Sequence, residues 1–425
     1  MTMTRFALLL ASLTFSLPAL AQDKAGDAAD AKADTQEPAA VKEADSQEKP
    51  AEEKPAAEKP AEAKKEQAQP TDAKPAEEKP AATAQTEKKE ETKTEDKPAA
   101  DKPESPAAAE DDSVAKGEVV LEGLNNPCGL AIQPETATLF LADSGNHKVI
   151  KLVDGKAEDV ITDFPSDVYG KGPMVNIGPL GLLFLDKNTL VVGGGGLPDG
   201  EELLRVYELP EDGKPIKADA MKASFKLAET DDIKGEGNFY ALASTGEAIY
   251  VTCNGDDTKG WVSKATLKGN TIEGYERYLA TKEATEVDAP VGITVSPDGY
   301  LVVGQMGEIN VPNDSLITFY DAASKEMLLN VKTNLHDIAA VAYSKRGQMY
   351  VLDYAWADAS QGGLFQIIED EKSDSGVRTK KITKLDKPTA MVFDASGNLF
   401  VTVVGEAADA NSKGQLIKIP ASAGL

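Results

Sequence analysis

The sequence contains few of the residues that build metal sites or contact nucleic acids. Its 425 residues include only two histidines, His147 and His336, which are too few for a three-histidine zinc site. Acidic residues outnumber basic ones. The chain has 71 aspartates and glutamates but 45 lysines and arginines, which gives a net charge of -26. Nucleic acids and anionic lipid surfaces attract basic patches. We therefore expect neither as a partner.

Long hydrophobic runs are absent apart from one near the start of the chain. Arg5 precedes an apolar run from Phe6 to Leu17, and the small-residue pattern Ala19-Leu-Ala follows it. The run is shorter than the ~20 apolar residues that span a bilayer. This pattern predicts a signal peptide over residues 1–21 and no membrane insertion after cleavage. No cysteine lies near the cleavage site, so a lipid anchor is not indicated.

Aromatic residues are missing from the next segment, residues 22–116. The segment consists mainly of Ala, Lys, Glu, Asp, Pro, Gln and Thr, and its larger apolar side chains are Val41 and Val114. The octet Pro-Ala-Glu-Glu-Lys-Pro-Ala-Ala occurs at Pro50 and again at Pro75. Such a low-complexity composition cannot bury a core and predicts a disordered tether. Both a spacer through an envelope layer and a solubilising tail are compatible with it.

The remaining residues, 117–425, contain a repeat of about 50 residues. Its clearest copy is Asn126-Pro-Cys-Gly-Leu-Ala-Ile followed by Leu139-Phe-Leu-Ala-Asp-Ser-Gly, and five further segments share the second pattern, beginning at Leu190, Ile249, Leu301, Met349 and Leu399. Each copy has room for four short antiparallel strands. The spacing predicts a single all-β domain, a six-bladed β-propeller. The sixth copy lacks a fourth strand, and the spare segment from Glu118 to Glu122 can close the ring.

Two stretches of the repeats resemble a known family. The segment Asp143-Ser-Gly-Asn-His-Lys-Val-Ile resembles the NHL repeat, whose members form six-bladed propellers, and the turn Ser296-Pro-Asp-Gly is similar to one in the senescence-marker/gluconolactonase group. That second resemblance implies a calcium-dependent lactonase, with the metal held by carboxylates and by Asn just before the glycine of inner strands. This chain departs from that pattern, since the corresponding residues are Cys128, Leu180, Val291, Ala339 and Thr389.

The loops between second and third strands indicate which face of the propeller binds ligands. They are long and glycine-rich, and all emerge on the side where the inner strands begin. Loops on a rigid scaffold are the usual location of binding sites. The candidate binding residues on this face are Asp143, Asn254, Trp261, Met306, Asp353, Tyr354 and Trp356. The two tryptophans can alternatively pack between blades.

Other candidate groups are open to more than one interpretation. Cys128 and Cys253 belong on the same face, as a disulfide or as two small buried side chains. His336 and Asp337 precede an inner strand and can form an acid–base pair, although no nucleophile motif accompanies them. His147 is expected to be a turn residue. The acidic stretches 199–202 and 254–257 are expected to be solvated loops, because they lack the alternating ligands of a calcium loop.

These patterns together predict an exported propeller, periplasmic or extracellular, that acts as a monomeric binding or protein-interaction module without a cofactor. The acidic loops favour a cationic or neutral protein or an envelope glycan as the partner. The alternative is a metal-dependent lactonase or hydrolase that holds calcium.

Deleting residues 22–114 is expected to leave the melting temperature within about two degrees, because a segment without packed contacts contributes little to folding. Thermal unfolding monitored by circular dichroism measures this. A loss of cooperative unfolding would contradict the predicted disorder.

Overall fold

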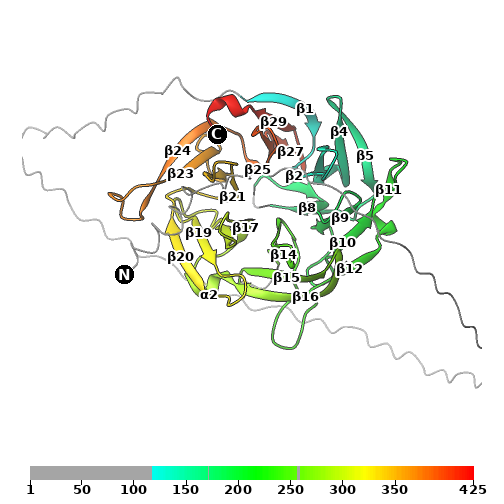
Figure 1. Cartoon of the computed structure of the whole chain (residues 1–425), viewed down its shortest axis with the longest axis horizontal. Coiled ribbons are helices and arrows are strands. Elements are labelled where there is room, and N and C mark those ends of the chain that lie inside the picture. The colour runs from blue at the N-terminus through cyan, green and yellow to red at the C-terminus, as the bar shows by residue number, and fades with distance from the viewer. Residues whose placement is uncertain (1–116, 171, 256–258) are drawn as a thin grey trace, which may run out of the picture. The chain divides into compact units, whose positions relative to one another are not determined.

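The computed structural model describes residues 117–425, with the exception of residues 171 and 256–258. These residues form a ring of six β-sheets around a central channel, as Figure 1 shows. The predicted six-bladed propeller is therefore confirmed. The predicted signal peptide (1–21) and tether (22–116) lie outside the described residues.

Each sheet runs from an inner strand at the channel to an outer strand at the rim. The first three sheets, from the channel outward, are β2 (Pro127–Ile132), β3 (Leu139–Asp143), β4 (Lys148–Val153), β5 (Lys156–Thr162) and β11 (Ile216–Lys217); β8 (Pro179–Phe184), β9 (Thr189–Gly194), β10 (Leu204–Glu208) and β12 (Ala223–Phe225); and β13 (Leu242–Ser244), β14 (Ala248–Thr252), β15 (Trp261–Lys268) and β16 (Thr271–Ala280). The other three are β17 (Pro290–Val295), β18 (Leu301–Gln305), β19 (Leu316–Tyr320) and β20 (Met327–Lys332); β21 (Ile338–Tyr343), β22 (Met349–Asp353), β23 (Gly363–Glu369) and β24 (Val377–Lys384); and β25 (Pro388–Phe393), β26 (Leu399–Val403), β29 (Gly414–Ile419) and β1 (Glu118–Leu124).

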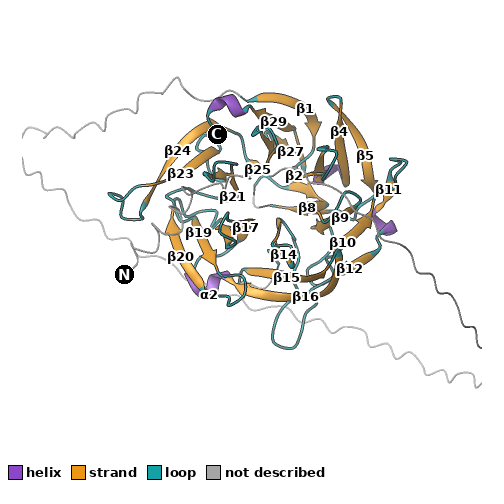
Figure 2. Cartoon of the chain, in the orientation of Figure 1, coloured by secondary structure: helices purple, strands orange, loops and turns teal. Residues whose placement is uncertain are grey.

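Helices are short, and the remaining strands form two small hairpins (Figure 2). The hairpins are β6 (Asp167–Tyr169) with β7 (Val175–Ile177), and β27 (Ala407–Ala408) with β28 (Asn411–Ser412). The helical turns are η1 (Ser144–Asn146), η2 (Ala218–Ala220), α2 (Thr281–Thr285) and η3 (Ala421–Ala423). None of the helices in residues 117–425, as far as they are described, is long and apolar enough to cross a membrane.

Glycines let the inner strands of neighbouring blades approach closely. A Cβ atom on Gly129 of β2 would overlap the backbone carbonyl of Leu180 in β8. A Cβ atom on Gly292 of β17 would lie 2.8 Å from the Cα atom of Ala340 in β21. Real Cβ contacts are longer than this. Close packing between neighbouring inner strands therefore requires glycine at positions 129 and 292.

The apolar core lies between the blades. One cluster joins the first two sheets and includes Phe140, Val149, Leu190 and Tyr207, all of which are almost fully buried. The alternating apolar residues of β3 and β9 face this cluster because side chains of a strand alternate between its two faces. Equivalent clusters follow around the ring, so each sheet is covered on both faces by its neighbours.

The last blade is closed by the first described strand. β1 pairs antiparallel with β29, from Glu118 opposite Lys418 to Leu124 opposite Gly414. This pairing confirms the predicted use of the spare N-terminal strand. It covers the exposed edge of β29, which would otherwise present unpaired backbone groups to solvent.

Removing β1 tests the closure of the ring. A chain that begins at residue 124 is expected to lose several kcal/mol of unfolding free energy or to aggregate, because it exposes the edge of β29 and lacks half-buried Val120 and Leu121, which pack against an apolar cluster of the ring. A chain that begins at residue 117 is the control. Urea unfolding and size-exclusion chromatography compare the two, and equal stability of two monomers would contradict the closure.

Candidate functional site

A pocket of about 300 Å³ opens at the end of the channel where the inner strands begin. Its wall combines the first residues of inner strands, such as Cys128 and Thr389, with the loops that follow second strands, such as Asn254 and Met306. We call it the mouth pocket. Three of the long second-to-third-strand loops, those that follow β14, β18 and β22, contribute to its wall.

β-Bulges determine which side chains enter the channel. In five of the six blades the register between the first two strands shifts at the start of the inner strand. The residues within these shifts include Cys128, Leu180, Val291, Ala339 and Thr389. A bulge re-aims the side chain of its extra residue. Four of the five line the mouth pocket, and Ala339 packs in the apolar cluster beside it.

These five residues do not fit the calcium ion that the gluconolactonase resemblance implies. Calcium takes six to eight oxygen ligands. The bulged positions supply apolar side chains, one thiol and one hydroxyl, and the Thr389 hydroxyl donates to the Pro127 carbonyl at 2.6 Å. Among the described residues no group of three or more His, Cys, Asp or Glu side chains is placed to hold a metal. We derive no step through a metal ion.

Both cysteines are free and lie in the wall of the mouth pocket. The two cysteines therefore form no disulfide bond. They do lie on the same face of the propeller, as expected. Burial raises the pKa of the Cys128 thiol to about 12, and it raises the pKa of the Cys253 thiol to about 12 as well. Neither sulfur is a thiolate at neutral pH. A nucleophilic role for either cysteine does not fit these surroundings.

A second hollow, of about 490 Å³, lies beside the mouth pocket and contains the candidate acid–base residues. His336, Asp337 and Asp358 line it, together with the amide side chains of Asn310 and Gln361. We call it the His336 hollow. Ile309 borders both hollows. The two spaces are thus neighbours on the same face of the propeller.

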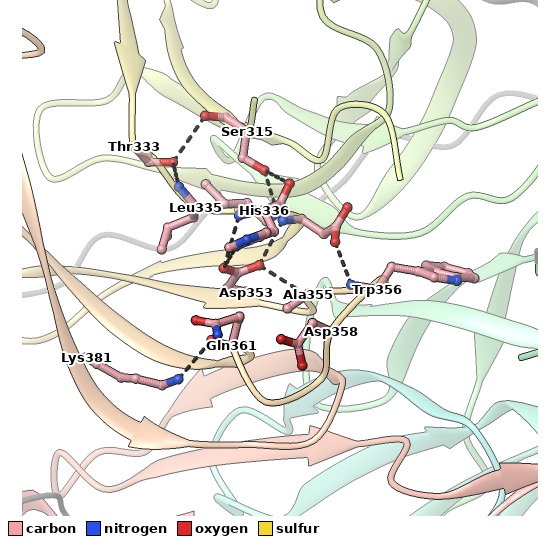
Figure 3. Close-up of polar contacts among 12 residues, drawn as sticks. Ser315, Thr333, Leu335, His336, Asp353, Ala355, Trp356, Asp358, Gln361 and Lys381 are labelled. Carbon is pink, nitrogen blue, oxygen red and sulfur yellow. Dashed lines mark hydrogen bonds and ion pairs between the residues drawn. The ribbon is translucent and has the colours of Figure 1, made fainter. Parts of the chain in front are cut away.

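The carboxylate of Asp353 lies beneath the imidazole of His336 and contacts it. Its Oδ2 lies 3.5 Å from His336 Nδ1 and accepts the His336 backbone N–H at 3.1 Å. Its Oδ1 accepts the backbone N–H groups of Asp337 at 2.8 Å and Ala355 at 3.2 Å. Asp353 is 1% exposed, whereas the His336 side chain is 27% exposed. Figure 3 shows this buried carboxylate beneath the imidazole.

Asp337 lies next to this pair and is also buried. Its Oδ2 accepts the backbone N–H of Trp356 at 2.6 Å. Burial and the nearby Asp353 carboxylate raise the pKa of Asp337 to about 6, against the effect of the Trp356 hydrogen bond. The His336 hollow therefore holds one carboxyl group whose protonation changes near neutral pH.

Trp356 lines the mouth pocket, whereas the next two residues of the chain, Ala357 and Asp358, line the His336 hollow. Its indole points away from His336 in Figure 3, toward the mouth pocket that it lines. Its Nε1 donates to the carbonyl of Gly172 at 2.9 Å, in the turn between β6 and β7. The ring also lies 5.1 Å from that of Tyr354. The hairpin β6–β7 is in this way tied to the loop that follows β22.

The structure brings together most of the predicted binding residues. Asn254, Met306, Tyr354 and Trp356 line the mouth pocket, and Asp353 supports the His336 hollow. Two do not join them. Asp143 is buried and accepts the Asn125 backbone N–H at 2.8 Å, so it holds a turn. Trp261 packs between blades, the alternative that the sequence left open.

Sequence reasoning missed Asn126, Asn238 and Tyr240, which also line the mouth pocket. Asn126 directly precedes the first inner strand, and this position next to a bulge could have marked it as a candidate binding residue. Asn238 and Tyr240 come from the irregular segment before β13, where no repeat pattern marks them. Their place depends on how this segment folds over the channel.

No protein-family model matches the chain, and no curated protein shows significant sequence similarity to it. The fold is similar to solved propellers. A luciferin-regenerating enzyme is 11% identical with a TM-score of 0.49, over 72% of this chain and 95% of that one. A PQQ-bound aldose sugar dehydrogenase from Streptomyces coelicolor is 14% identical with a TM-score of 0.48, over 72% and 98%. A gluconolactonase from Xanthomonas campestris is 14% identical with a TM-score of 0.46, over 72% and 89%. At these identities the likeness concerns the fold.

The prediction of a non-enzymatic interaction module is corrected. The similar propellers named above are enzymes. In addition, the aromatic residues expected to anchor a partner do not form an exposed patch, because Tyr354 is only 6% exposed and Trp261 packs between blades. The described part of this face instead has a pocket next to a hollow in which His336 contacts a buried carboxylate.

The raised pKa of Asp337 predicts a pH dependence of stability. Its folded value of about 6 exceeds the ordinary 3.8, so the folded protein binds more protons between these values. The free energy of unfolding should therefore fall as the pH rises from about 4 to about 6, by at most about 3 kcal/mol. Asp337→Asn keeps an acceptor for Trp356 and should remove this slope. Urea unfolding at several pH values tests the difference, and parallel curves for the two proteins would contradict it.

Proposed function

We propose that this protein is a hydrolase that cleaves a small ester or lactone with water activated by His336. The observation that carries the proposal is the pairing of His336 Nδ1 with the buried Asp353 carboxylate at 3.5 Å, in the wall of a hollow. At 3.5 Å the two groups are within ion-pair range but farther apart than in a normal hydrogen bond, and contacts between catalytic groups often tighten only when substrate binds. The fold supports catalysis and binding alike, so the site and not the fold carries the argument.

The carboxylate determines which imidazole nitrogen acts as the base. Asp353 accepts only, so Nδ1 of His336 carries the proton when it faces this carboxylate. The lone pair then resides on Nε2. Within the described residues no hydrogen bond uses Nε2, while the imidazole borders the hollow. Nε2 can therefore accept a proton from a water molecule in the hollow, and Asp353 stabilises the imidazolium that forms.

The reaction proceeds in two steps. His336 Nε2 takes a proton from water as the water oxygen forms a bond with the carbonyl carbon of the substrate. The C–O bond to the leaving oxygen then breaks, and the imidazolium returns the proton to that oxygen. The products are a carboxylic acid and an alcohol, or one hydroxy acid from a lactone. Amide groups of Asn310 and Gln361 line the hollow and can donate to the oxyanion.

Neighbouring groups favour a base that becomes positively charged during the reaction. Asp337 and Asp358 line the same hollow, and both carboxyl groups interact electrostatically with His336. Negative charges near an imidazole stabilise its protonated form. The mouth pocket, which shares Ile309 with this hollow, provides space for the part of the substrate that does not react.

Several sequence-based expectations accompany this proposal. We infer from residues 139–150 that the repeats are related to NHL repeats, and from residues 1–21 that the chain is exported. Its monomeric state likewise remains a prediction. None of these enters the proposed chemistry.

Replacing His336 tests the proposal directly. His336→Gln should lower kcat for the best substrate in a panel of p-nitrophenyl esters and small lactones by about 100-fold or more, with little change in KM, because the base acts only in the transition state. Asp353→Asn should lower kcat less. His147→Asn is the matched control, since His147 is the other histidine of the chain and lies outside the hollow. A His336→Gln rate within twofold of the unaltered protein would contradict the proposal.

A further inference from the structure

The mouth pocket offers hydrogen-bond acceptors, and none of the described residues in its wall is basic. We propose that it binds the primary ammonium group of a small organic cation. Binding in the mouth pocket does not depend on the hydrolysis proposed for His336. It goes beyond that proposal because it assigns a ligand class to a separate space.

Three amide side chains of the pocket are held in one orientation. The amide nitrogens of Asn126, Asn238 and Asn254 donate to the backbone carbonyls of Asn176 at 3.1 Å, Asn254 at 3.0 Å and Pro290 at 2.9 Å. A backbone carbonyl only accepts, so the nitrogen of each amide must face it. Among the described residues no hydrogen bond uses the three amide oxygens. These oxygens are left as acceptors for a ligand.

Several side-chain donors of the pocket wall are already engaged. Thr389 donates its hydroxyl to the Pro127 carbonyl at 2.6 Å, and the Cys128 thiol lies 3.4 Å from the carbonyl oxygen of Asn126. The Trp356 indole donates to Gly172. The hydroxyl groups of Tyr169 and Tyr354 can donate or accept. A ligand in this pocket therefore meets more acceptors than donors.

This imbalance distinguishes three classes of ligand. An ammonium group has three donors and no acceptor, so the shortage of donors in the wall costs it nothing. An alcohol has one donor, and of the described side-chain donors only the hydroxyl groups of Tyr169 and Tyr354 are left to donate to its lone pairs. A carboxylate has acceptors only, and burying it without a partner is costly. The wall therefore selects the ammonium group.

The charges and aromatic rings of the wall act in the same direction. Among the described residues, the charged side chains of the wall are Asp288 and Glu308. Lys282 lies 2.8 Å from Asp288 and partly neutralises it, whereas the side chain of Glu308 is exposed at the rim. Tyr354 and Trp356 add an aromatic surface, and such surfaces attract cations. The volume of about 300 Å³ limits the ligand to a small molecule.

Three probes of nearly the same shape test the proposal on the full-length chain. Cyclohexylammonium, cyclohexanol and cyclohexanecarboxylate differ mainly in the charge and donors of one group. Titrations at pH 7.5, followed by calorimetry or ligand-observed NMR, should show that the ammonium binds at least tenfold tighter than the alcohol. The carboxylate should show no saturable binding. Equal affinity for ammonium and carboxylate, or no saturable ammonium binding up to about 50 mM, overturns the proposal.

Variants locate the binding and separate it from the proposed catalysis. Asn254→Leu should weaken ammonium binding about tenfold, while Asn313→Leu, which alters the neighbouring hollow, should not change it. Met306→Lys places a cation in the wall from a half-buried position and should abolish ammonium binding. Thermal unfolding confirms that each variant is folded. His336→Gln should retain full affinity, so a failure of the hydrolase proposal leaves this result standing. Unchanged affinity in both folded Asn254→Leu and Met306→Lys would overturn the proposed location.

Discussion

Hydrogen bonding between β1 and β29 is the constraint on which the rest of the structure depends. It joins the two ends of the described chain and turns a row of sheets into a closed ring. It also brings Asn125 and Asn126 beside the hairpin β27–β28, where the Asn126 backbone N–H donates to the Ser412 hydroxyl at 2.6 Å. The Asn126 amide lines the mouth pocket. Closure of the ring therefore builds part of the pocket directly.

Bulges at the inner strands then decide the chemistry of the channel. They turn one side chain from each of five blades toward the axis. In this chain these side chains are mainly apolar, and the oxygen ligands of a calcium site are missing from those positions. The side chains at these five positions, rather than the backbone, therefore set the chemistry of this part of the channel. This is why a shared propeller fold says little about the reaction.

The polar chemistry lies at the rim instead, where buried carboxylates fix loop backbones. Asp353 accepts three backbone N–H groups in addition to facing His336, and Asp337 accepts the Trp356 N–H. Buried carboxylates are stable only when such partners satisfy them. The hydrogen bonds that hold the loops also fix the imidazole and the indole. Structural support and the proposed chemistry thus use the same two aspartates.

The sequence by itself determined the strands, their grouping into six blades and the closing role of residues 118–122. These features follow from local alternation, turn residues and a repeat of about 50 residues, all of which are readable along the chain. It also indicated the face of the site, because long loops follow the second strands. The tertiary structure alone decided which residues meet there. Trp356 and Gly172 are 184 residues apart, and the bond between them depends on ring closure and on the path of a hairpin. The disulfide question, the burial of Tyr354 and the placement of Trp261 were decided in the same way, because each depends on packing between blades, which no local pattern encodes.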